Sequence, residues 1–378
     1  MFCILNVNFL QMLEEELLAV LTLQKAKGVG DIIAKKLIAH CGSAKSVFSE
    51  KKGTVAKING VGSSKIQYLF NKENKIQAEQ ELNYILKHTV PYCYYQDAKY
   101  PNKLKHCIDG PILLFSDGQI NLNKQPVISI VGTRKMTLYG RDFIDDLIEN
   151  IAPYNPVIVS GFAYGVDITA QKAAMKNELQ TIGVLAHGFD KMYPKSHKKY
   201  VSQVNEKGGF YTEFWHDEEP LRENFLKRNR IVAGMADATI IIESAIKGGS
   251  LVTADIANSY SRDVFAVPGK TTDILSKGCN DLIKRNKAGI LTSPQDLIDA
   301  MNWELNGDSQ KTIQPQLFLE LTDEEQLIYD YLLKNNKQYL DAISLECGIP
   351  VYKMATLLFN LEMKGVLRPL PGKLFELV

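Results

Sequence analysis

The stretch VISIVGTRKMTLYG, residues 127–140, decides the fold of this chain. Its first five residues are mostly apolar and β-branched, which is typical of a strand buried on both faces of a parallel sheet. Gly132 ends that run, and we expect Thr133 to cap an amphipathic helix over residues 137–151. Strand, glycine turn and helix form half of a βαβ unit, whose tip offers backbone N–H groups and a helix N-terminus to an anion. Arg134 adds a planar guanidinium suited to phosphate.

The same stretch lacks the GxGxxG pattern of dinucleotide-binding turns, and no acidic residue stands at the usual distance of about 20 residues beyond it. Two interpretations of the stretch alone stay open. It is either an anion-binding tip or a Rossmann-like turn that binds no nucleotide and carries a surface arginine. In both cases the missing pattern argues against NAD, so we expect no nucleotide cofactor.

The overall composition is that of an ordinary soluble protein, with 378 residues, 45% hydrophobic and 23% charged. A chain of this length should hold two or three domains. Because the net charge is only +1, any affinity for nucleic acid must come from local patches of cations and not from the charge of the whole chain.

Six cysteines are scattered along the chain without a CxxC pair. This usage predicts reduced thiols in a cytoplasmic protein and no metal site. The first ten residues are apolar, but they are too few to span a bilayer and lack the basic start of a signal peptide. We therefore expect no membrane partner, and we place the start of the folded part at Met12, where a better helical pattern opens.

Strands and helices alternate between residue 127 and about residue 300. This order implies right-handed crossovers and a parallel sheet with helices on both faces. The fold class is therefore α/β, with an extended Rossmann-like core over residues 88–301, and ligands of such a sheet bind at the carboxyl ends of the strands. After the strand at 127–131 we expect further strands at residues 157–159, 181–185, 209–212, 238–242 and 264–267.

Two similar segments, residues 23–37 and 55–69, lie in a small helical region that we place at residues 12–87. Each has an apolar approach, Gly-Val-Gly and then a lysine-bearing helix, which resembles the helix-hairpin-helix motif of SAM-like domains. Such glycines free backbone N–H groups at a helix N-terminus to meet a DNA phosphate. The alternative is a helical domain that kept the turn for packing and serves as a protein contact. The glycines concerned are Gly28, Gly30, Gly60 and Gly62.

A polar linker at residues 302–319 precedes a small C-terminal domain at residues 320–378. Thr322 with Glu325 three residues later forms a capping box, and three helices followed by a hairpin describe a winged helix. Its third helix carries few cations, whereas a helix that reads a DNA groove needs donors for phosphates and base edges. We therefore favour contact with a protein over duplex binding for this domain.

Several loops at the ends of the predicted strands combine glycine or small residues with fixed cations. If the sheet is parallel, these loops share one rim, and a rim with several cations and few acids suits an extended polyanion. Phe225 offers a stacking face for an unpaired base, worth about 1–3 kcal/mol. The simpler alternative is that each loop carries solvated surface cations. The predicted DNA-binding residues are Gly132, Arg134, Ser160, Gly161, Lys195, Lys198, Lys199, Phe225, Arg228, Asn229, Arg230, Gly248, Gly249 and Ser250.

A catalytic site is not indicated. Several carboxylates lie near the predicted strand ends, but no pair of them has a spacing that dictates a mechanism. His187 has no Ser or Cys nucleophile beside it, so a structural role is the simpler interpretation. No cluster of His, Cys and Asp has the spacing of metal ligands. We therefore expect a binding protein and not an enzyme.

Seven motifs, in their order along the chain, resemble those of the DNA-processing protein A (DprA/Smf) family. The resemblance covers most of the chain, and the helix-hairpin-helix start and winged-helix end are similar to those of the longer members. The motifs are GTRKMTLYG, SGFAYGVD, GFDKMYPKSH, ENFLKRNRIVAG, GGSLVTADIA, VFAVPG and KGCNDLIKRNKA, between residues 132 and 288.

The resemblance implies a function. Members of the family bind single-stranded DNA through an extended Rossmann core without sequence preference, and they form homodimers through that core. In natural transformation they protect incoming strands and load the RecA recombinase onto them. No catalytic activity or cofactor is established for the family. Carried over by motif, Arg134 and Lys195 are the leading phosphate contacts.

Two other classes of function remain as alternatives. GGSLVTADIA also resembles the phosphate loop of the lysine-decarboxylase-like nucleoside 5′-monophosphate phosphoribohydrolases. That loop needs a further glycine and threonine where this chain has Leu251 and Val252, and a glutamate where it has Asp255. The other alternative is a scaffold whose rim cations meet a protein partner.

Overall fold

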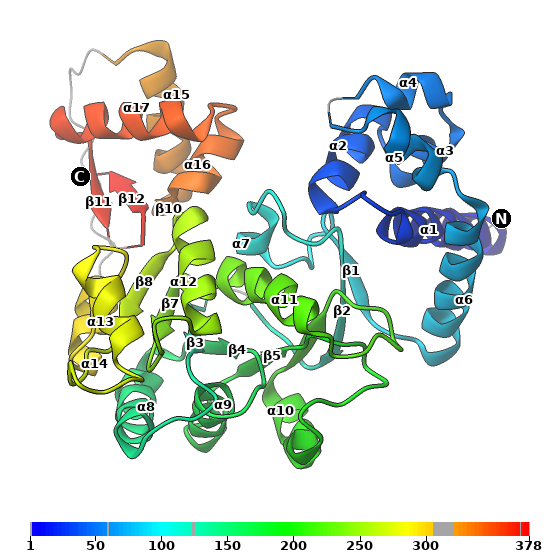
Figure 1. Ribbon diagram of the computed structural model, residues 1–378. Coiled ribbons are helices and arrows are strands. Elements are labelled where there is room, and N and C mark those ends of the chain that lie inside the picture. Colours follow the sequence, from blue (N-terminus) through cyan, green and yellow to red (C-terminus); the bar gives the residue numbers. More distant parts are fainter. Residues whose placement is uncertain (1, 59, 123–124, 305–320, 371, 378) are drawn as a thin grey trace.

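The computed structural model describes residues 2–58, 60–122, 125–304, 321–370 and 372–377. Figure 1 shows three parts: a group of helices near the N-terminus, a sheet with helices on both faces, and a small C-terminal domain that stands against the sheet. The mixed α/β fold expected from the sequence is confirmed.

A nine-stranded sheet forms the middle of the molecule, in the order β1-β2-β6-β5-β4-β3-β7-β8-β9. The seven strands from β3 to β9 are parallel, whereas β1 and β2 are antiparallel additions beside β6. The chain moves one way from β3 to β6 and then returns to β7, so the topological switch point lies between β3 and β7. The strands are β1 (Tyr92–Tyr94), β2 (Leu113–Gly118), β3 (Val127–Val131), β4 (Val157–Ser160), β5 (Thr181–Val184), β6 (Gly209–Thr212), β7 (Ala238–Ile241), β8 (Asp263–Ala266) and β9 (Gly289–Ile290).

Alternate residues of the strands pack against opposite layers of helices. Ile128 and Ile130 of β3 face the apolar sides of α8 and α9, whereas Val127 and Val131 face α11 and α12. Burial on both faces explains the nearly continuous apolar composition of this strand. The helices are α7 (Asn102–Lys105), α8 (Leu138–Ile151), α9 (Val166–Lys176), α10 (Val201–Lys207), α11 (Arg222–Met235), α12 (Gly249–Ser259), α13 (Lys277–Lys284) and α14 (Pro294–Ala300), with short 3-10 helices η1 (Ala152–Tyr154) and η2 (Lys195–Tyr200).

The cap of α8 differs from the expected one. Thr137, not Thr133, is the N-cap, and its side chain accepts a hydrogen bond from Gly140 N at 3.3 Å. The reason is the buried Glu243 at the end of β7, whose carboxylate accepts a bond from Thr137 N at 2.8 Å. The intervening residues are therefore held as a loop, in which the Thr133 hydroxyl accepts a hydrogen bond from Lys135 N at 3.1 Å.

The N-terminal part is helical and begins before the expected position, because α1 extends ahead of Met12 to Phe2. Helices α2 and α5 start at the two glycine doublets. The start of α2 is turned toward the core, since the Asp31 carboxylate accepts a hydrogen bond from Ile112 N at 2.8 Å. This favours the packing interpretation for the first doublet. The helices are α1 (Phe2–Lys25), α2 (Asp31–Cys41), α3 (Ala44–Ser49), α4 (Lys52–Ala56), α5 (Gly62–Leu69) and α6 (Lys72–His88).

The C-terminal part is the expected winged helix. Its capping box is present, because Glu325 N donates to the Thr322 hydroxyl at 3.3 Å and Thr322 N donates to the Glu325 carboxylate at 2.8 Å. Most of the linker expected at residues 302–319 lies outside the described residues. The elements are α15 (Asp323–Asn335), β10 (Gln338–Tyr339), α16 (Leu340–Glu346), α17 (Val351–Met363), β11 (Leu367–Leu370) and β12 (Leu374–Leu377).

Asp237, just before β7, fastens the winged helix to the core. Its carboxylate accepts hydrogen bonds from Val127 N at 2.8 Å and from the Tyr339 hydroxyl at 2.6 Å, and it pairs with the Lys103 ammonium. Arg262 adds an ion pair with Asp341 at 3.4 Å. All these core residues lie at or before the amino ends of the strands, so the winged helix docks on the edge opposite the predicted rim.

Three further properties concern the described part of the chain. No group of three or more His, Cys, Asp or Glu side chains there is placed to hold a metal ion. No single helix there is long and apolar enough to cross a membrane. The bent pair α16 and α17 together has the length and the apolar composition of a span. The five cysteines whose side chains are described are free, and burial raises the pKa of the Cys279 thiol to about 12, so that thiol is protonated at neutral pH.

The contribution of the Lys103–Asp237 ion pair to the stability of the fold can be tested. Lys103→Ala would leave the Asp237 carboxylate buried without its cation, a loss worth about 3–5 kcal/mol in the free energy of unfolding. Lys287→Ala is the matched control, because its pair with Asp255 at 2.8 Å is exposed and should contribute less than about 1 kcal/mol. Urea titrations followed by circular dichroism compare the two, and equal shifts in midpoint would contradict the role given to Lys103.

Candidate nucleic-acid interface

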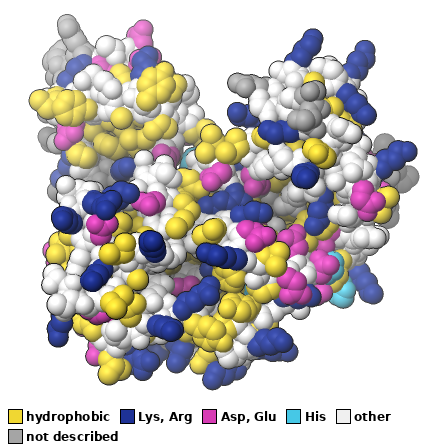
Figure 2. Space-filling view, viewed as in Figure 1, with side chains coloured by type: hydrophobic (Ala, Val, Ile, Leu, Met, Phe, Trp, Pro, Cys, Tyr) yellow, Lys and Arg dark blue, Asp and Glu magenta, His cyan; other side chains and the backbone are white. Residues whose placement is uncertain are grey.

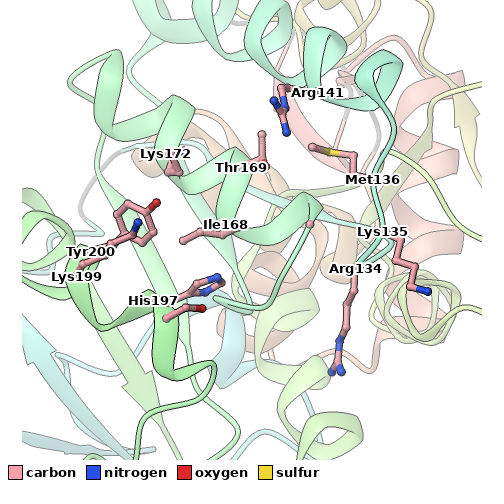
Figure 3. Close-up of a pocket in the computed structure, with 12 residues that line it drawn as sticks. Arg134, Lys135, Met136, Arg141, Ile168, Thr169, Lys172, His197, Lys199 and Tyr200 are labelled. Carbon is pink, nitrogen blue, oxygen red and sulfur yellow. The ribbon is translucent and has the colours of Figure 1, made fainter.

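A pocket of about 430 Å³ opens between the loop after β3, the helix α9 and the 3-10 helix η2 (Figure 3). Figure 3 shows its cations on two sides, with Arg134, Lys135 and Arg141 across from Lys172 and Lys199. None of its lining residues is acidic. The lining consists of Arg134, Lys135, Met136, Arg141, Gly165, Ile168, Thr169, Lys172, Ser196, His197, Lys199 and Tyr200.

Two backbone segments meet at the base of this pocket. Val166 N at the start of α9 donates to Thr133 O at 3.1 Å. Gly165 has a φ of +76°, and a Cβ there would collide with Thr133 O, so only glycine permits this approach. The close contact brings the loop that carries Arg134 beside the helix that carries Lys172.

Aromatic rings hold the η2 side of the pocket. The ring of Tyr200 lies 5.1 Å from the Lys199 ammonium and 5.7 Å from that of Lys172, so one ring gathers two cations. The buried His197 bonds through Nδ1 to Phe162 O at 2.9 Å. Burial lowers the pKa of His197, so this ring is neutral at pH 7 and anchors η2 without adding charge.

Phe225 on α11 joins the loops after β3 and β5. Its ring lies 5.1 Å from the guanidinium carbon of Arg134 and 6.0 Å from that of Arg228. Tyr193 packs edge-on against it at 5.5 Å, two residues before Lys195. Arg134, Arg228 and the loop that carries Lys195 therefore lie at one edge of the sheet, as the rim hypothesis requires.

Arg228, however, is not a surface cation. Only 4% of it is exposed, and its guanidinium donates to Gly161 O at 2.6 Å and to Val184 O at 2.5 Å. A Cβ on Gly161 would collide with this guanidinium, which explains the glycine. Burial lowers the pKa of Arg228 to about 10, with the buried Asp167 opposing that shift, so the group is charged at neutral pH. The expectation that Arg228 contacts phosphate directly is corrected, because it lies beneath the rim and ties β4 to β5.

Other predicted contacts are also turned inward. Arg230 pairs with Asp31 at 3.0 Å and with Glu213, so it joins the core to the N-terminal helices. The buried Ser160 hydroxyl donates to Ile130 O at 2.6 Å. The buried Ser250 hydroxyl bonds to that of Ser244 at 2.9 Å, and the side chain of Asn229 accepts a bond from Arg228 Nε at 3.3 Å. The side chains of Arg230, Ser160 and Ser250 are occupied by the protein, which gives them structural roles in this fold, whereas the half-buried Asn229 stays a prediction.

The remaining predicted residues lie at the carboxyl edge of the sheet and differ in their exposure to solvent. Lys195 and Lys198 are exposed on η2 but do not line the pocket. Gly132 is half-buried at the end of β3, and the remaining pair, Gly248 and Gly249, begins α12 after β7. The list of predicted DNA-binding residues omitted Lys135, Arg141 and Lys172, although Lys135 lies within the motif GTRKMTLYG. Projecting α9 as a helix would have found Lys172, since it falls on one face with Ile168 and Thr169.

The charge pattern sets the chemistry of the pocket. The side chains of Arg134, Lys135 and Arg141 form no ion pair with any acid of the described part of the chain. Cations that converge without carboxylates repel one another and raise the local positive potential, which favours an anion between them. The arrangement can therefore bind and orient a phosphate.

Comparison with known proteins identifies relatives of both the sheet and the C-terminal domain. The sequence profile of the family described as DNA recombination-mediator protein A matches residues 91–302, and that of the DprA winged helix domain matches residues 314–373. The DNA processing protein DprA of Streptococcus pneumoniae is 38% identical over 202 residues, which cover 53% of this chain and 71% of that protein.

Two solved structures are similar to this one. DNA processing protein A from Streptococcus pneumoniae aligns with a TM-score of 0.65 and 32% identity, over 73% of this chain and 95% of that chain. A structure of DNA processing protein A from Helicobacter pylori, which concerns the single-stranded DNA binding mode of that protein, aligns with a TM-score of 0.51 and 30% identity, over 56% of this chain and 95% of that chain.

The contrast between Arg228 and Arg134 can be tested by thermal melting. Arg228→Ala removes two charge-assisted hydrogen bonds worth about 1.5–3 kcal/mol each, so its melting temperature should fall clearly. Arg134→Ala, at an exposed residue whose guanidinium lies over the Phe225 ring, should lose about 0.5–1 kcal/mol. Equal melting curves for the Arg228 variant and the parent would restore it as a surface cation.

Proposed function

Because the chain belongs to the DNA recombination-mediator protein A family, we propose that it is a DNA-processing protein that binds single-stranded DNA at the carboxyl edge of its sheet. The observation that carries the proposal is the pocket of about 430 Å³ lined by five cations and no acid. Phosphate groups of a nucleic acid supply the anion that this pocket favours, and the contact does not depend on base sequence.

The shape of the site favours a single strand over a duplex. Cations lie on two sides of the pocket, so a phosphate between them is contacted from both sides. A flexible single strand can bend into such a cavity, whereas a stiff double helix cannot. Aromatic faces border the same edge, with Tyr164 44% exposed and Phe225 half-buried. Such faces stack on unpaired bases.

The winged helix is proposed to have a different role from the pocket. Several of its cations are paired with its own acids: Lys353 pairs with Glu324 at 2.5 Å, and Arg368 pairs with Glu376 at 2.5 Å. It is also fastened to the amino edge of the sheet, away from the pocket. We therefore keep protein contact as its proposed role.

Catalysis on the bound strand has no support in the geometry. Asp255, the residue that a phosphoribohydrolase would need at the ribose, lies exposed on α12 with its carboxylate 2.8 Å from the Lys287 ammonium. It does not line the pocket, and neither does any other acid. Our proposal is accordingly a binding protein and not an enzyme.

Single-strand binding can be tested with two matched double variants. Arg134→Ala with Lys199→Ala removes a cation from each side of the pocket, so affinity for oligo-dT should fall by at least about tenfold, or 1.4 kcal/mol. The salt dependence should flatten by about 0.7 per lost phosphate contact. Fluorescence anisotropy at two salt concentrations measures both quantities.

The control is Arg368→Ala with Lys353→Ala, which removes the same two residue types from the winged helix. It should bind within about twofold of the parent, because those cations are already paired. Undiminished binding by the pocket variant would exclude the pocket. A large loss in the control would show that the winged helix grips DNA.

The wider role follows from the family as a separate proposal. We infer that the protein acts as a homodimer in natural transformation, protects incoming strands and loads the RecA recombinase onto them, which is what the description recombination mediator suggests. Added to strands coated with a single-strand-binding protein, it should speed RecA filament formation, and the Arg134→Ala, Lys199→Ala variant should not. Filament growth at the same rate with and without the protein would rule out loading.

A further inference from the structure

Exposed apolar side chains of residues 125–304, which contain the parallel strands, are concentrated at the carboxyl edge of the sheet. Residues 125–304 contain nine large hydrophobic side chains that are exposed, and all but Ile290 follow β3, β4, β6, β7 or β8, in the loop or in the first two turns of the next helix. Exposed apolar groups gathered in this way mark a binding surface. The eight are Leu138, Tyr139, Tyr164, Leu221, Leu226, Ile246, Val252 and Ile274.

Cations accompany these side chains beyond the pocket. The loops after β7 and β8 and the start of α13 carry the exposed residues Ile246, Lys247, Lys270, Ile274 and Lys277, which we call the β7–β8 patch. The two isoleucines are 59% and 68% exposed. None of the three ammonium groups has an ion-pair or hydrogen-bond partner in the described chain.

The acid nearest to the patch in sequence is already engaged. Asp273 accepts hydrogen bonds from Leu275 N at 3.1 Å and from the Ser276 hydroxyl at 3.3 Å. Its carboxylate therefore shapes the loop after β8 and does not pair with a lysine. The patch is thus a mixture of apolar and unpaired cationic groups. Figure 2 shows apolar, basic and acidic side chains interspersed over the visible face of the core.

Tyr139 connects this patch to the pocket. It stands in the first turn of α8, close to Arg134 and Arg141 in the chain, and its hydroxyl donates to Pro268 O in the loop after β8 at 2.8 Å. The ring is 49% exposed and fixed at its far end. Because β3, β7 and β8 are parallel neighbours, their loops open at one edge, and Tyr139 spans them.

The geometry points to a second DNA-binding segment on this edge: a single strand that leaves the pocket passes Tyr139 and continues over the β7–β8 patch. This rests on the proposed function of the pocket. Phosphates meet Lys247, Lys270 and Lys277, while bases lie on the tyrosine ring and the isoleucines, the usual pairing of a cationic groove with stacking faces. A protein partner is the competing occupant, but continuity with the pocket and the absence of an acceptor for the lysines favour the strand.

Oligonucleotide length separates the two segments. A strand of about 6 nucleotides can fill the pocket alone, whereas one of about 20 also reaches the patch. Lys247→Ala with Lys270→Ala and Lys277→Ala should weaken binding of the long strand by about tenfold and lower its salt slope by about 2, because about 0.7 is lost for each phosphate. Binding of the short strand should change less than about twofold. The control Lys51→Ala with Lys72→Ala and Lys87→Ala removes three exposed lysines from the N-terminal helices.

The outcomes are distinct. If the parent protein fails to bind the short strand, the proposed function of the pocket fails with it. If the short strand binds and the triple variant holds the long strand as tightly as the parent, the β7–β8 patch is not part of the DNA path and a protein partner becomes its occupant. Equal losses for both lengths, or an equal loss in the control, would also overturn the second segment. A photocrosslinker at position 270, which should label the long strand only, gives an independent readout.

Discussion

A guanidinium group buried beneath the carboxyl edge holds the candidate interface together. Arg228 donates to backbone carbonyls at the ends of two neighbouring strands, Gly161 after β4 and Val184 of β5. A buried charge is tolerated only when its donors are satisfied and an opposite charge is near, and Asp167 supplies that charge. The loops that follow both strands are therefore fixed relative to each other. The exposed cations on these loops consequently lie near their binding positions before any ligand arrives, which reduces the entropy lost on binding.

The same residue shows where sequence reasoning succeeds and where it stops. Strands such as Val127–Val131 can be predicted from the sequence because the pattern is local: every residue is apolar or small, and both faces are buried. The capping box at Thr322 is readable for the same reason. By contrast, burial of Arg228 depends on a glycine 67 positions away, and the cap at Thr137 depends on Glu243 from a distant strand. A cationic motif thus locates the edge of the sheet, but it cannot tell which cation faces solvent.

Pairing, more than the number of cations, distinguishes the surfaces of this molecule. The flanking parts carry many lysines and arginines, but their contacts with the core and with themselves use acids, as in Arg230 with Asp31 and Lys353 with Glu324. At the carboxyl edge Glu243 is committed to the loop after β3, and Lys191 pairs with Glu219 at 2.7 Å. The cations of the pocket and of the β7–β8 patch, by contrast, have no ion-pair partner in the described part of the chain. Unpaired cations in such an arrangement favour a polyanion, whereas paired cations elsewhere do not.

A net charge of +1 has a consequence for how such a strand is captured. Charges separated by more than the Debye length of about 8 Å at physiological salt are largely screened, so a nearly neutral protein exerts little attraction at long range. A polyanion is attracted only where cations locally outnumber acids, and in this molecule that place is the carboxyl edge of the sheet. The apolar and aromatic groups interleaved with those cations act at the same short range and are insensitive to salt. In the binding mode proposed above, electrostatic contact selects the edge, and stacking on groups such as Phe225 and Tyr139 retains the strand once it is there.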